Sequence, residues 1–440
     1  MPIARPSRSP DREPEPDGAA EAGARPDAGE VHGQTSKPAP SRQSLRGLDW
    51  FIFFLADVQT GFGPFIAVYL TTQKWTQAQI GLVLSIGGIV GLIGQMPGGA
   101  IIDAARSERR VAGLAIAAIG GCALAYAAWP IFPLVAAAAT LHAAASCVLG
   151  PAIAAISLGL VGPRGMAERL GRNARFASLG NGVAAAVMGT CGYLLSSRAV
   201  FLVTFILAFP TLIALSRVRE REIDVARAHG RADHEDKEVA RLSNLLGLLR
   251  QRALLVFALG VFLLQLANAA MLPLMAGVVT TKSSEWAPML IAFCIVVPQA
   301  IVALTSPSVG AVAQQWGRRP LLMLGFAALA MRGALFAVVH DPYVLVAVQI
   351  FDGVTAAVFA VMIPLTVADV AFGSGHFNLA QGIVGTASGI GGSLSTVVAG
   401  FASDRYGSAT AFMGLSGVAL TGLLLIALLM PETGHRRRRA

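Results

Sequence analysis

Apolar residues occur along this chain in long runs, and the polar residues between the runs are confined to short gaps. The runs begin near Trp50, and each can cross about 30 Å of hydrocarbon as a helix that rises about 1.5 Å per residue. The pattern therefore predicts an all-α membrane protein. The twelve expected transmembrane helices cover residues 49–71, 77–99, 110–128, 131–160, 172–195, 199–216, 252–278, 285–306, 320–339, 343–370, 377–401 and 408–430.

One polar interruption is much longer than the others, and it divides the apolar runs into six and six. It covers residues 217–251 and mixes acidic with basic side chains, so we expect a cytoplasmic linker between two helical bundles, 48–216 and 252–431. Residues 1–47 carry almost no large apolar side chains and cannot form a core, which predicts a disordered tail in the cytoplasm. Residues 432–440 form a short basic tail.

The composition agrees with a membrane protein and narrows the range of partners. Of the 440 residues, 55% are hydrophobic and 13% are charged, and the mean hydropathy is +0.63, which is too apolar for a soluble chain of this length. The formal charge of +9 does not indicate a nucleic-acid partner, because the arginines lie in short loops and at the termini instead of on one face. We expect them to contact anionic lipid headgroups and to set the topology.

The distribution of Lys and Arg between alternate loops predicts the orientation of the chain. The loops on one side hold more basic residues than the loops on the other side. Because basic loops tend to stay in the cytoplasm, we expect a multi-pass protein of the cell membrane with both termini inside. The richer side holds Arg106, Arg109, Arg110, Arg164, Arg169, Arg172, Arg175, Arg318 and Arg319, and the poorer side holds Lys74, Arg198, Lys282 and Arg405.

Two apolar runs end in similar short motifs made of glycine, a polar residue and arginines. Each motif is expected to form a helix end, a tight basic loop and the start of the next helix, with the glycine permitting close helix approach and the Asp or Gln capping a helix end. The first glycine lies 211 residues before the second, which indicates an internal repeat. The first motif comprises Gly99, Asp103, Arg106, Arg109 and Arg110, and the second comprises Gly310, Gln314, Gly317, Arg318 and Arg319.

At these residues the chain resembles the major facilitator superfamily, whose loop between helices two and three carries Gly-x-x-x-Asp-(Arg/Lys)-x-Gly-(Arg/Lys)-(Arg/Lys), with a weaker copy between helices eight and nine. The chain has Ala104 where a base is usual, Arg106 where the second glycine is usual and Gln314 where the second acid is usual. The resemblance covers residues from about 48 to 433. It implies two six-helix bundles that give alternating access to a site near the membrane midplane, with helices one, four, seven and ten around a central cavity.

Two ionisable residues inside the predicted helices are candidates for proton coupling. Asp57 in the first helix precedes Gly61, Gly63 and Pro64, a sequence typical of a bent helix near a cavity. Because a carboxylate in hydrocarbon costs several kcal/mol unless it is paired or hydrated, we expect Asp57 to bind and release a proton during transport; the alternative is a structural hydrogen bond between helices. An acid in this helix also resembles the proton site of the superfamily's drug/proton antiporters. His142 in the fourth helix is either a second protonation site or a neutral, hydrogen-bonded histidine.

Other polar residues within the apolar runs are candidates for structural or substrate contacts. Arg332 and Asp352 are expected at similar depths in two antiparallel neighbouring helices, which predicts a buried ion pair. Asp352 is also a candidate for gating or substrate binding, because the resemblance places its helix at the central cavity. Amide side chains either line a polar path or join helices. The amide candidates are Gln265, Asn268, Gln299 and Gln349.

The chain lacks the motifs of several other function classes. None of its lysines follows the glycines of a phosphate-binding loop, and no triad of nucleophile, base and orienting acid is found, so we expect neither an ATP-driven pump nor an enzyme. His229 and His234 in the linker come nearest to a metal site, but a solvated charged loop is the preferred interpretation. No metal and no cofactor are expected.

These patterns together predict a secondary transporter that moves a small solute by alternating access. Proton-coupled export of a small organic molecule is the preferred activity. Proton-coupled uptake of a nutrient or metabolite is the first alternative, and a membrane sensor that does not transport is the second. The expected partners are the solute, protons and anionic lipids, and a bundle of this kind can function as a monomer.

Overall fold

The architecture of the described part of the chain is helical. The computed structural model describes residues 40–60, 66, 69–70, 73–229, 251–275, 287–339, 341–372, 374 and 376–433. Helices of the first half are α1 (Arg42–Thr60), α3 (Gln77–Ala104), α4 (Glu108–Ala128), α5 (Phe132–Leu194), α6 (Ser197–Arg217), the short 3-10 helix η1 (Glu220–Glu222) and α7 (Val225–Ala228). Helices of the second half are α9 (Arg252–Asn268), α11 (Ala287–Trp316), α12 (Arg319–Val338), α13 (Pro342–Val370), α14 (Phe377–Tyr406) and α15 (Ser408–Leu429).

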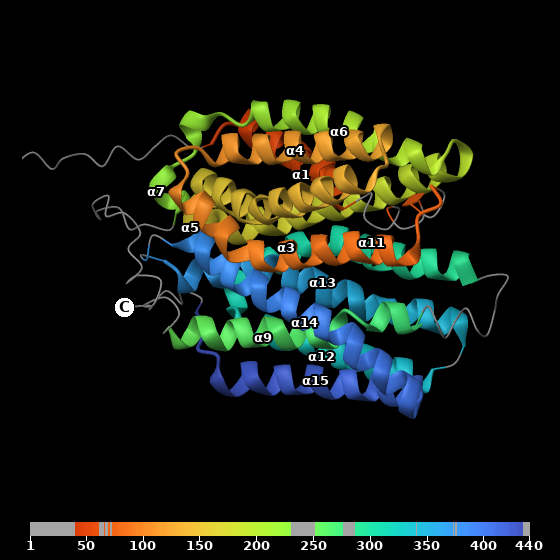
Figure 1. Ribbon diagram of the computed structural model, residues 1–440. Helices are drawn as coiled ribbons and strands as arrows, with labels where there is room; N and C mark the ends of the chain where they lie inside the picture. Colours follow the sequence, from red (N-terminus) through yellow and green to blue (C-terminus); the bar gives the residue numbers. More distant parts are fainter. Residues whose placement is uncertain are drawn as a thin grey trace, which may run out of the picture. The chain divides into compact units, whose positions relative to one another are not determined.

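Within these described ranges, ten helices are long and apolar enough to cross a membrane. The predicted class of all-α membrane protein is therefore confirmed, whereas the count of twelve transmembrane helices stays a prediction. Figure 1 shows the long helices lying side by side along a common direction. This is the arrangement expected when every backbone polar group must be satisfied inside its own helix, because hydrocarbon offers no hydrogen-bonding partner.

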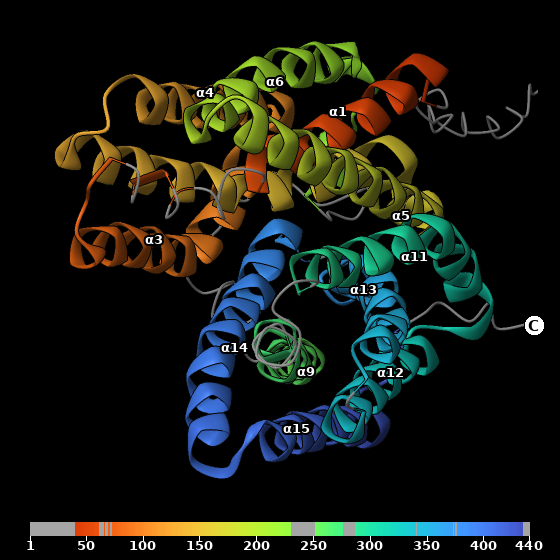
Figure 2. The ribbon, with the colours of Figure 1, turned by 90° about the vertical axis from the view of Figure 1, so that its right-hand side faces the viewer.

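The helices form two bundles, and each bundle has its own hydrophobic core. Phe51, Tyr126 and Phe201 are buried in the first core, and Phe257 and Phe326 are buried in the second. Figure 2 shows α1, α4 and α6 in one group and α9, α12 and α15 in the other. The second core also includes side chains from α5, so this long helix contributes to both bundles.

The two bundles meet mainly where α3 packs against α14 and where α5 packs against α11. At four glycines on these helices, an added Cβ atom would collide with the backbone of the opposite helix. Small residues allow helix backbones to approach closely, and here they do so between the two halves of the chain. The four glycines are Gly99, Gly171, Gly310 and Gly382.

Two predicted helices continue further than their apolar runs suggest. Helix α3 extends through Asp103 to Ala104, and α11 extends through Gln314 to Trp316, so most of each glycine and arginine motif is helical. The expected loops shrink to a few residues, and Gly317, with a φ of 91°, makes the second turn. The predicted ends at 99 and 306 were wrong because a helix can continue beyond the hydrocarbon when its last turn packs against a neighbour.

The predicted loop between residues 160 and 172 is much shorter than expected, because two helices, both covered by the label α5, meet at Gly162. Helix α5 is interrupted only at Gly162, where φ is 67° and ψ is 177°, a conformation that glycine adopts without strain. The arginines assigned to an inner loop therefore lie on helix, and their charge had hidden the helical segment from the apolar pattern. They are Arg164, Arg169, Arg172 and Arg175.

The predicted boundary of the N-terminal tail is also wrong, because α1 begins at Arg42 instead of after residue 47. Glu222 fixes the start of the helix: its Oε2 accepts hydrogen bonds from the backbone N and the Oγ of Ser41, both at 2.9 Å. Burial raises the pKa of the Glu222 carboxyl, but hydrogen bonds from Ser41 and Ser44 and the charge of Arg219 outweigh it and hold the pKa below its ordinary value. The carboxylate therefore binds α1 in its ionised form at neutral pH.

Candidate functional site

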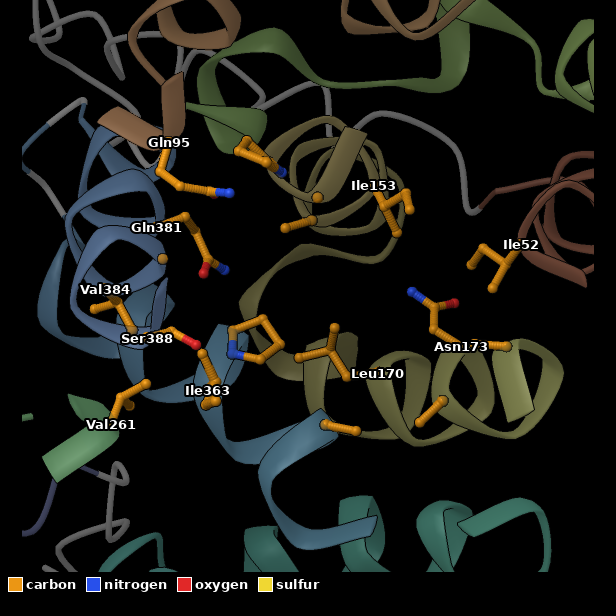
Figure 3. Close-up of a pocket in the computed structure, with 18 residues that line it drawn as sticks. Ile52, Gln95, Ile153, Leu170, Asn173, Val261, Ile363, Gln381, Val384 and Ser388 are labelled. Atoms are coloured by element: carbon orange, nitrogen blue, oxygen red, sulfur yellow. The ribbon is translucent and has the colours of Figure 1, made fainter. Parts of the chain in front are cut away.

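A cavity of about 390 Å³ lies between the two bundles. Helices α1, α3 and α5 of the first half and α9, α13 and α14 of the second half all contribute to its wall. Figure 3 shows the lining side chains around the open space, with Gln95, Gln381 and Ser388 on one side and Asn173 on the other. Within the described part of the chain, the rest of the wall is almost entirely apolar and includes no ionisable residue.

Two prolines lie within the helices that form this wall. Pro151 lies within α5 and Pro364 within α13, and both line the cavity. A proline has no N–H to donate, so the carbonyl four residues earlier loses its usual helical partner and the helix kinks. In α13 that carbonyl belongs to Ala360, which is itself a lining residue. Pro364 thus leaves a backbone acceptor beside the cavity.

The bundles are joined at the end that carries Arg106, Arg109, Arg110, Arg318 and Arg319, here called the basic end. Asp103 of α3 accepts three hydrogen bonds from the first turn of α14: from the backbone N of Asn378 at 3.2 Å, from Asn378 Nδ2 at 2.7 Å and from the backbone N of Leu379 at 2.7 Å. A carboxylate at this position caps the helix and interacts favourably with its dipole. Asp103 of the first bundle therefore binds the N-terminus of α14 in the second bundle.

The second motif makes a similar contact on the opposite seam of the interface. Gln314 of α11 donates a hydrogen bond from Nε2 to the carbonyl oxygen of Arg164 at 3.2 Å, and Gly310 lies against the backbone of Ala167. Arg318 forms an ion pair with Asp369, with Nε and Oδ2 2.7 Å apart. Each copy of the repeated motif therefore fastens one bundle to the other at the basic end.

The first residues of the linker form a third contact between the two bundles at the basic end. His229 is only 3% exposed, and its Nε2 lies 3.1 Å from Oε1 of the buried Glu108. Its carbonyl oxygen accepts a hydrogen bond from the backbone N of Phe377, and the Ala228 carbonyl accepts one from Asn378 Nδ2 at 3.3 Å. We call residues 220–229 the docked linker segment, because it contacts both bundles.

The interpretation of a solvated loop was therefore wrong at His229, while His234 lies outside the described residues. His229 is buried by residues that are distant in the sequence, and the charged residues around it in the linker do not reveal these contacts. The segment is anchored on α5, where the backbone N of Asp224 donates to the Gly159 carbonyl at 3.0 Å. In the described part of the chain, no group of three or more His, Cys, Asp or Glu residues is placed to hold a metal ion.

Removing the His229 side chain should loosen this end of the molecule. In His229→Ala, the buried Glu108 loses the imidazole that lies 3.1 Å from its Oε1, and the lost side-chain volume leaves a cavity, so local opening should become several-fold more frequent. Hydrogen–deuterium exchange should then increase both in residues 220–229 and in the first turn of α14. Arg221→Ala is the matched control, because Arg221 is an exposed residue of the same segment. Equal exchange in wild type and His229→Ala would show that His229 does not hold the docked linker segment against the bundles.

Charged residues at the start of the first predicted helix and near a predicted loop also support the cavity. Asp49 of α1, 1% exposed, is bonded to Arg169 Nη2 at 2.6 Å and to Arg172 Nη2 at 2.6 Å. Arg169 in turn donates from Nε to Oδ1 of Asn173 at 2.6 Å, and Asn173 Nδ2 donates to Ser157 Oγ at 2.8 Å. The spacing of positions 169, 172 and 173 on one helical face was the available signal.

The ion pair expected from helix depths is present in the second bundle. Arg332 Nη1 lies 2.7 Å from Asp352 Oδ1 and 2.7 Å from Asn268 Oδ1, and its guanidinium stacks over Phe336. The Arg332 side chain is 1% exposed, whereas that of Asp352 is 21% exposed. This pair does not line the cavity.

The other predicted site residues are spread over the molecule. Gln265 donates to Ser388 Oγ at 3.1 Å, Gln349 is fully buried near the Cys294 thiol, and Gln299 is half-buried on α11. His142 is half-buried on α5. The side chain of Asp57, which belongs to α1, lies outside the described part. None of the predicted substrate contacts is among the residues that line the cavity, and their roles stay predictions.

Two helical bundles around a shared cavity, in a chain rich in helices of membrane-crossing length, define a multi-pass membrane transport protein. The chain belongs to the major facilitator superfamily, whose model matches residues 50–302 and 257–440. Membership of this family and the names of its relatives identify a transporter and not an enzyme.

The chain is also similar to individual proteins of this family. Two MFS-type transporters of Mycobacterium tuberculosis, from strains CDC 1551 / Oshkosh and ATCC 25618 / H37Rv, are each 38% identical over 393 residues, which is 88% of this chain and 93% of theirs. The solved structure of the human organic anion transporter MFSD10 (TETRAN) has a TM-score of 0.67 at 14% identity, covering 88% of this chain and 100% of that chain. A variant of the nucleoside transporter NupG has a TM-score of 0.61 at 17% identity with the same coverage. At these identities the two structures show the fold alone.

Proposed function

We propose that the chain is a secondary active transporter that exports a small organic molecule across the cell membrane, coupled to proton entry. The observation that carries this proposal is the cavity between the bundles together with its closure at the basic end by Asp103. Gln381 lines the cavity about one helical turn after Asn378, which Asp103 caps. Separation of the bundles at the basic end would therefore expose the cavity there, as alternating access requires.

The proposed orientation places the basic end, both termini and the docked linker segment in the cytoplasm. Its support is the excess of arginine at that end, since basic loops are retained on the cytoplasmic side and interact with anionic lipids. The cavity closed at the basic end would then belong to an outward-facing state. A monomer contains both walls of the cavity and both motif copies, which supports a functional unit of one chain.

Coupling is proposed to reside in Asp57, with His142 as a second candidate. The support is the cost of a carboxyl group within an apolar helix, and the resemblance of an acid in the first helix to the proton site of drug/proton antiporters. Asp352 is a weaker candidate for this role in the described geometry, because Arg332 already neutralises it.

Proton-coupled uptake of a nutrient or metabolite is the second candidate function. The amides Gln95, Gln381 and Asn173 on the cavity wall favour it, because polar nutrients are bound through such groups. Export and uptake use the same cavity and differ in the direction of net flux, so a flux measurement separates them.

Exchange of Asp57 for asparagine tests the proposed coupling. In cells that express wild type, a broad panel of metabolites and toxic compounds should contain at least one compound whose accumulation falls in a manner dependent on the proton gradient. Asp57→Asn should abolish that gradient dependence, because asparagine cannot bind and release a proton. Asp404→Asn, at an exposed acid of α14, is the control and should behave as wild type.

The outcomes of this experiment separate the candidate functions. Entry of a compound only in cells that contain the protein would establish uptake. Comparable pH profiles of transport for wild type and Asp57→Asn would refute the role of Asp57. Unchanged accumulation of every compound would contradict transport and favour a sensor.

A further inference from the structure

The two bundles each supply a glutamine to the same side of the cavity. Gln95 comes from α3 and Gln381 from α14, and Figure 3 shows both carboxamides directed into the open space. Gln95 reaches across the interface, because its Oε1 would lie 2.7 Å from a Cβ atom added to Gly385 of α14. In the described ranges, neither carboxamide has a hydrogen-bond partner within the protein. Their donors and acceptors are therefore available to a ligand.

The remaining polar side chains of the wall are held in place by the protein. Ser388 Oγ accepts a hydrogen bond from Gln265, so its own hydroxyl hydrogen is left to donate. Asn173 lies across the cavity and is fixed at both ends of its amide by Arg169 and Ser157. The cavity thus combines two adaptable carboxamides with an oriented hydroxyl and a fixed amide dipole.

The same wall offers no counter-charge to an ion. None of the lining residues that the structure describes is ionisable, and Arg169, the buried cation that holds Asn173, is already paired with Asp49. A charged solute would lose its hydration there without gaining a partner, which costs far more than the desolvation of a polar but neutral group. Amides, in contrast, both donate and accept, so they satisfy a neutral polar group in either orientation.

We propose that this cavity binds an uncharged, amphipathic solute whose amide, hydroxyl or keto group is held between Gln95 and Gln381. The apolar part of the solute lies against Ile153, Val261 and Ile363. Because the two glutamines belong to different bundles, the bound solute bridges the surfaces that must separate during transport. The inference rests on the proposed transport function, since it takes this cavity as the transport site.

Matched triads of small compounds test the proposed charge preference. The probes are N-acetyl amino acid amides, which are neutral, with the corresponding N-acetyl amino acids, which are anions, and amino acid amides, which are cations. Binding to the purified full-length protein is measured by the shift of its melting temperature with ligand concentration. Neutral members should stabilise the protein, and Gln95→Leu or Gln381→Leu should weaken their binding about tenfold or more, the equivalent of a lost hydrogen bond of about 1.4 kcal/mol.

Two further sets of variants separate a lost contact from a damaged fold. Gln95→Glu and Gln381→Glu keep the shape of the side chain, and each should shift the preference within a triad from the neutral amide to the cation. Gln315→Leu removes an exposed glutamine of α11 that does not line the cavity and should bind the neutral probes as wild type does. Stronger binding of anions or cations to wild type would overturn the proposal, as would the absence of binding by every neutral probe or unchanged binding in both leucine variants.

Flux of a bound probe in proteoliposomes distinguishes this inference from the proposed function. Neutral binding without any flux would contradict transport and leave the ligand class established. Flux of charged members only would support transport and overturn the inference.

Discussion

Replacement of Arg332 with methionine is expected to lower the free energy of unfolding of the second bundle by about 3 kcal/mol, at the lower end of the range for breaking a buried pair. The guanidinium holds Asp352 and Asn268 simultaneously and is almost wholly buried, so its removal leaves a carboxylate without a partner between α12 and α13. The lower end of the range is used because the Asp352 side chain is 21% exposed and is therefore less deeply buried than its partner.

Thermal melting of the purified protein measures this effect. Arg405→Met is the matched control, because Arg405 is an exposed residue of α14, and it should melt within about 0.5 kcal/mol of wild type. The double exchange Arg332→Asp with Asp352→Arg restores opposite charges at the two positions and should recover part of the stability and transport lost in either single variant. A double variant no better than the worse single variant would show that the pair is not the stabilising unit.

Exchange of Gly99 for alanine should reduce transport about 5-fold to 30-fold. The added Cβ atom would meet the carbonyl oxygen of Asn378 at less than contact distance, so α3 and α14 must move apart. That movement breaks the hydrogen bonds from Asn378 and Leu379 to Asp103 and removes about 1–2 kcal/mol of capping energy. A loss of this size shifts a conformational equilibrium about 5-fold to 30-fold.

Gly88→Ala in the same helix provides the control for this prediction. No atom lies within 4 Å of a Cβ added at Gly88, so this variant gains helix propensity of about 1 kcal/mol without a collision. It should transport as wild type does. Initial transport rates and hydrogen exchange in the first turn of α14 should change together in Gly99→Ala, and unaltered exchange there would show that the two helices tolerate the methyl group without separating.

The course of the helices could be predicted from the sequence because hydrocarbon demands long apolar segments. The Arg332 and Asp352 contact followed from the same information, since the distance of each residue from a helix end gives its depth and antiparallel neighbours share that depth. The exact ends of α3 and α11 could not be predicted. Their final turns are stabilised by the other bundle and carry polar residues, which an apolar pattern excludes.

The lining of the cavity could not be predicted for a different physical reason. A helix inside a membrane bundle is apolar on nearly every face, so the pattern gives its depth but not its rotation about its own axis. The sequence analysis therefore named Gln265 and Gln349 and did not name Gln95 or Gln381, although the first pair contacts neighbouring helices and only the second pair faces the cavity. His229 was missed because Glu108 and Phe377, which bury it, are far away in the sequence.

The docked linker segment belongs to the first half of the chain by sequence but also contacts the second half. Residues 220–229 follow the first bundle in the chain, yet their contacts with Phe377 and Asn378 belong to the second. A chain cut after His229 would lose the covalent connection between the halves but keep every one of these contacts. A cut before Glu220 would separate the docked linker segment from the first bundle, to which it is joined in the intact chain. The point where the first bundle ends in the sequence therefore differs from the last described point of contact between the halves in this segment, which is His229.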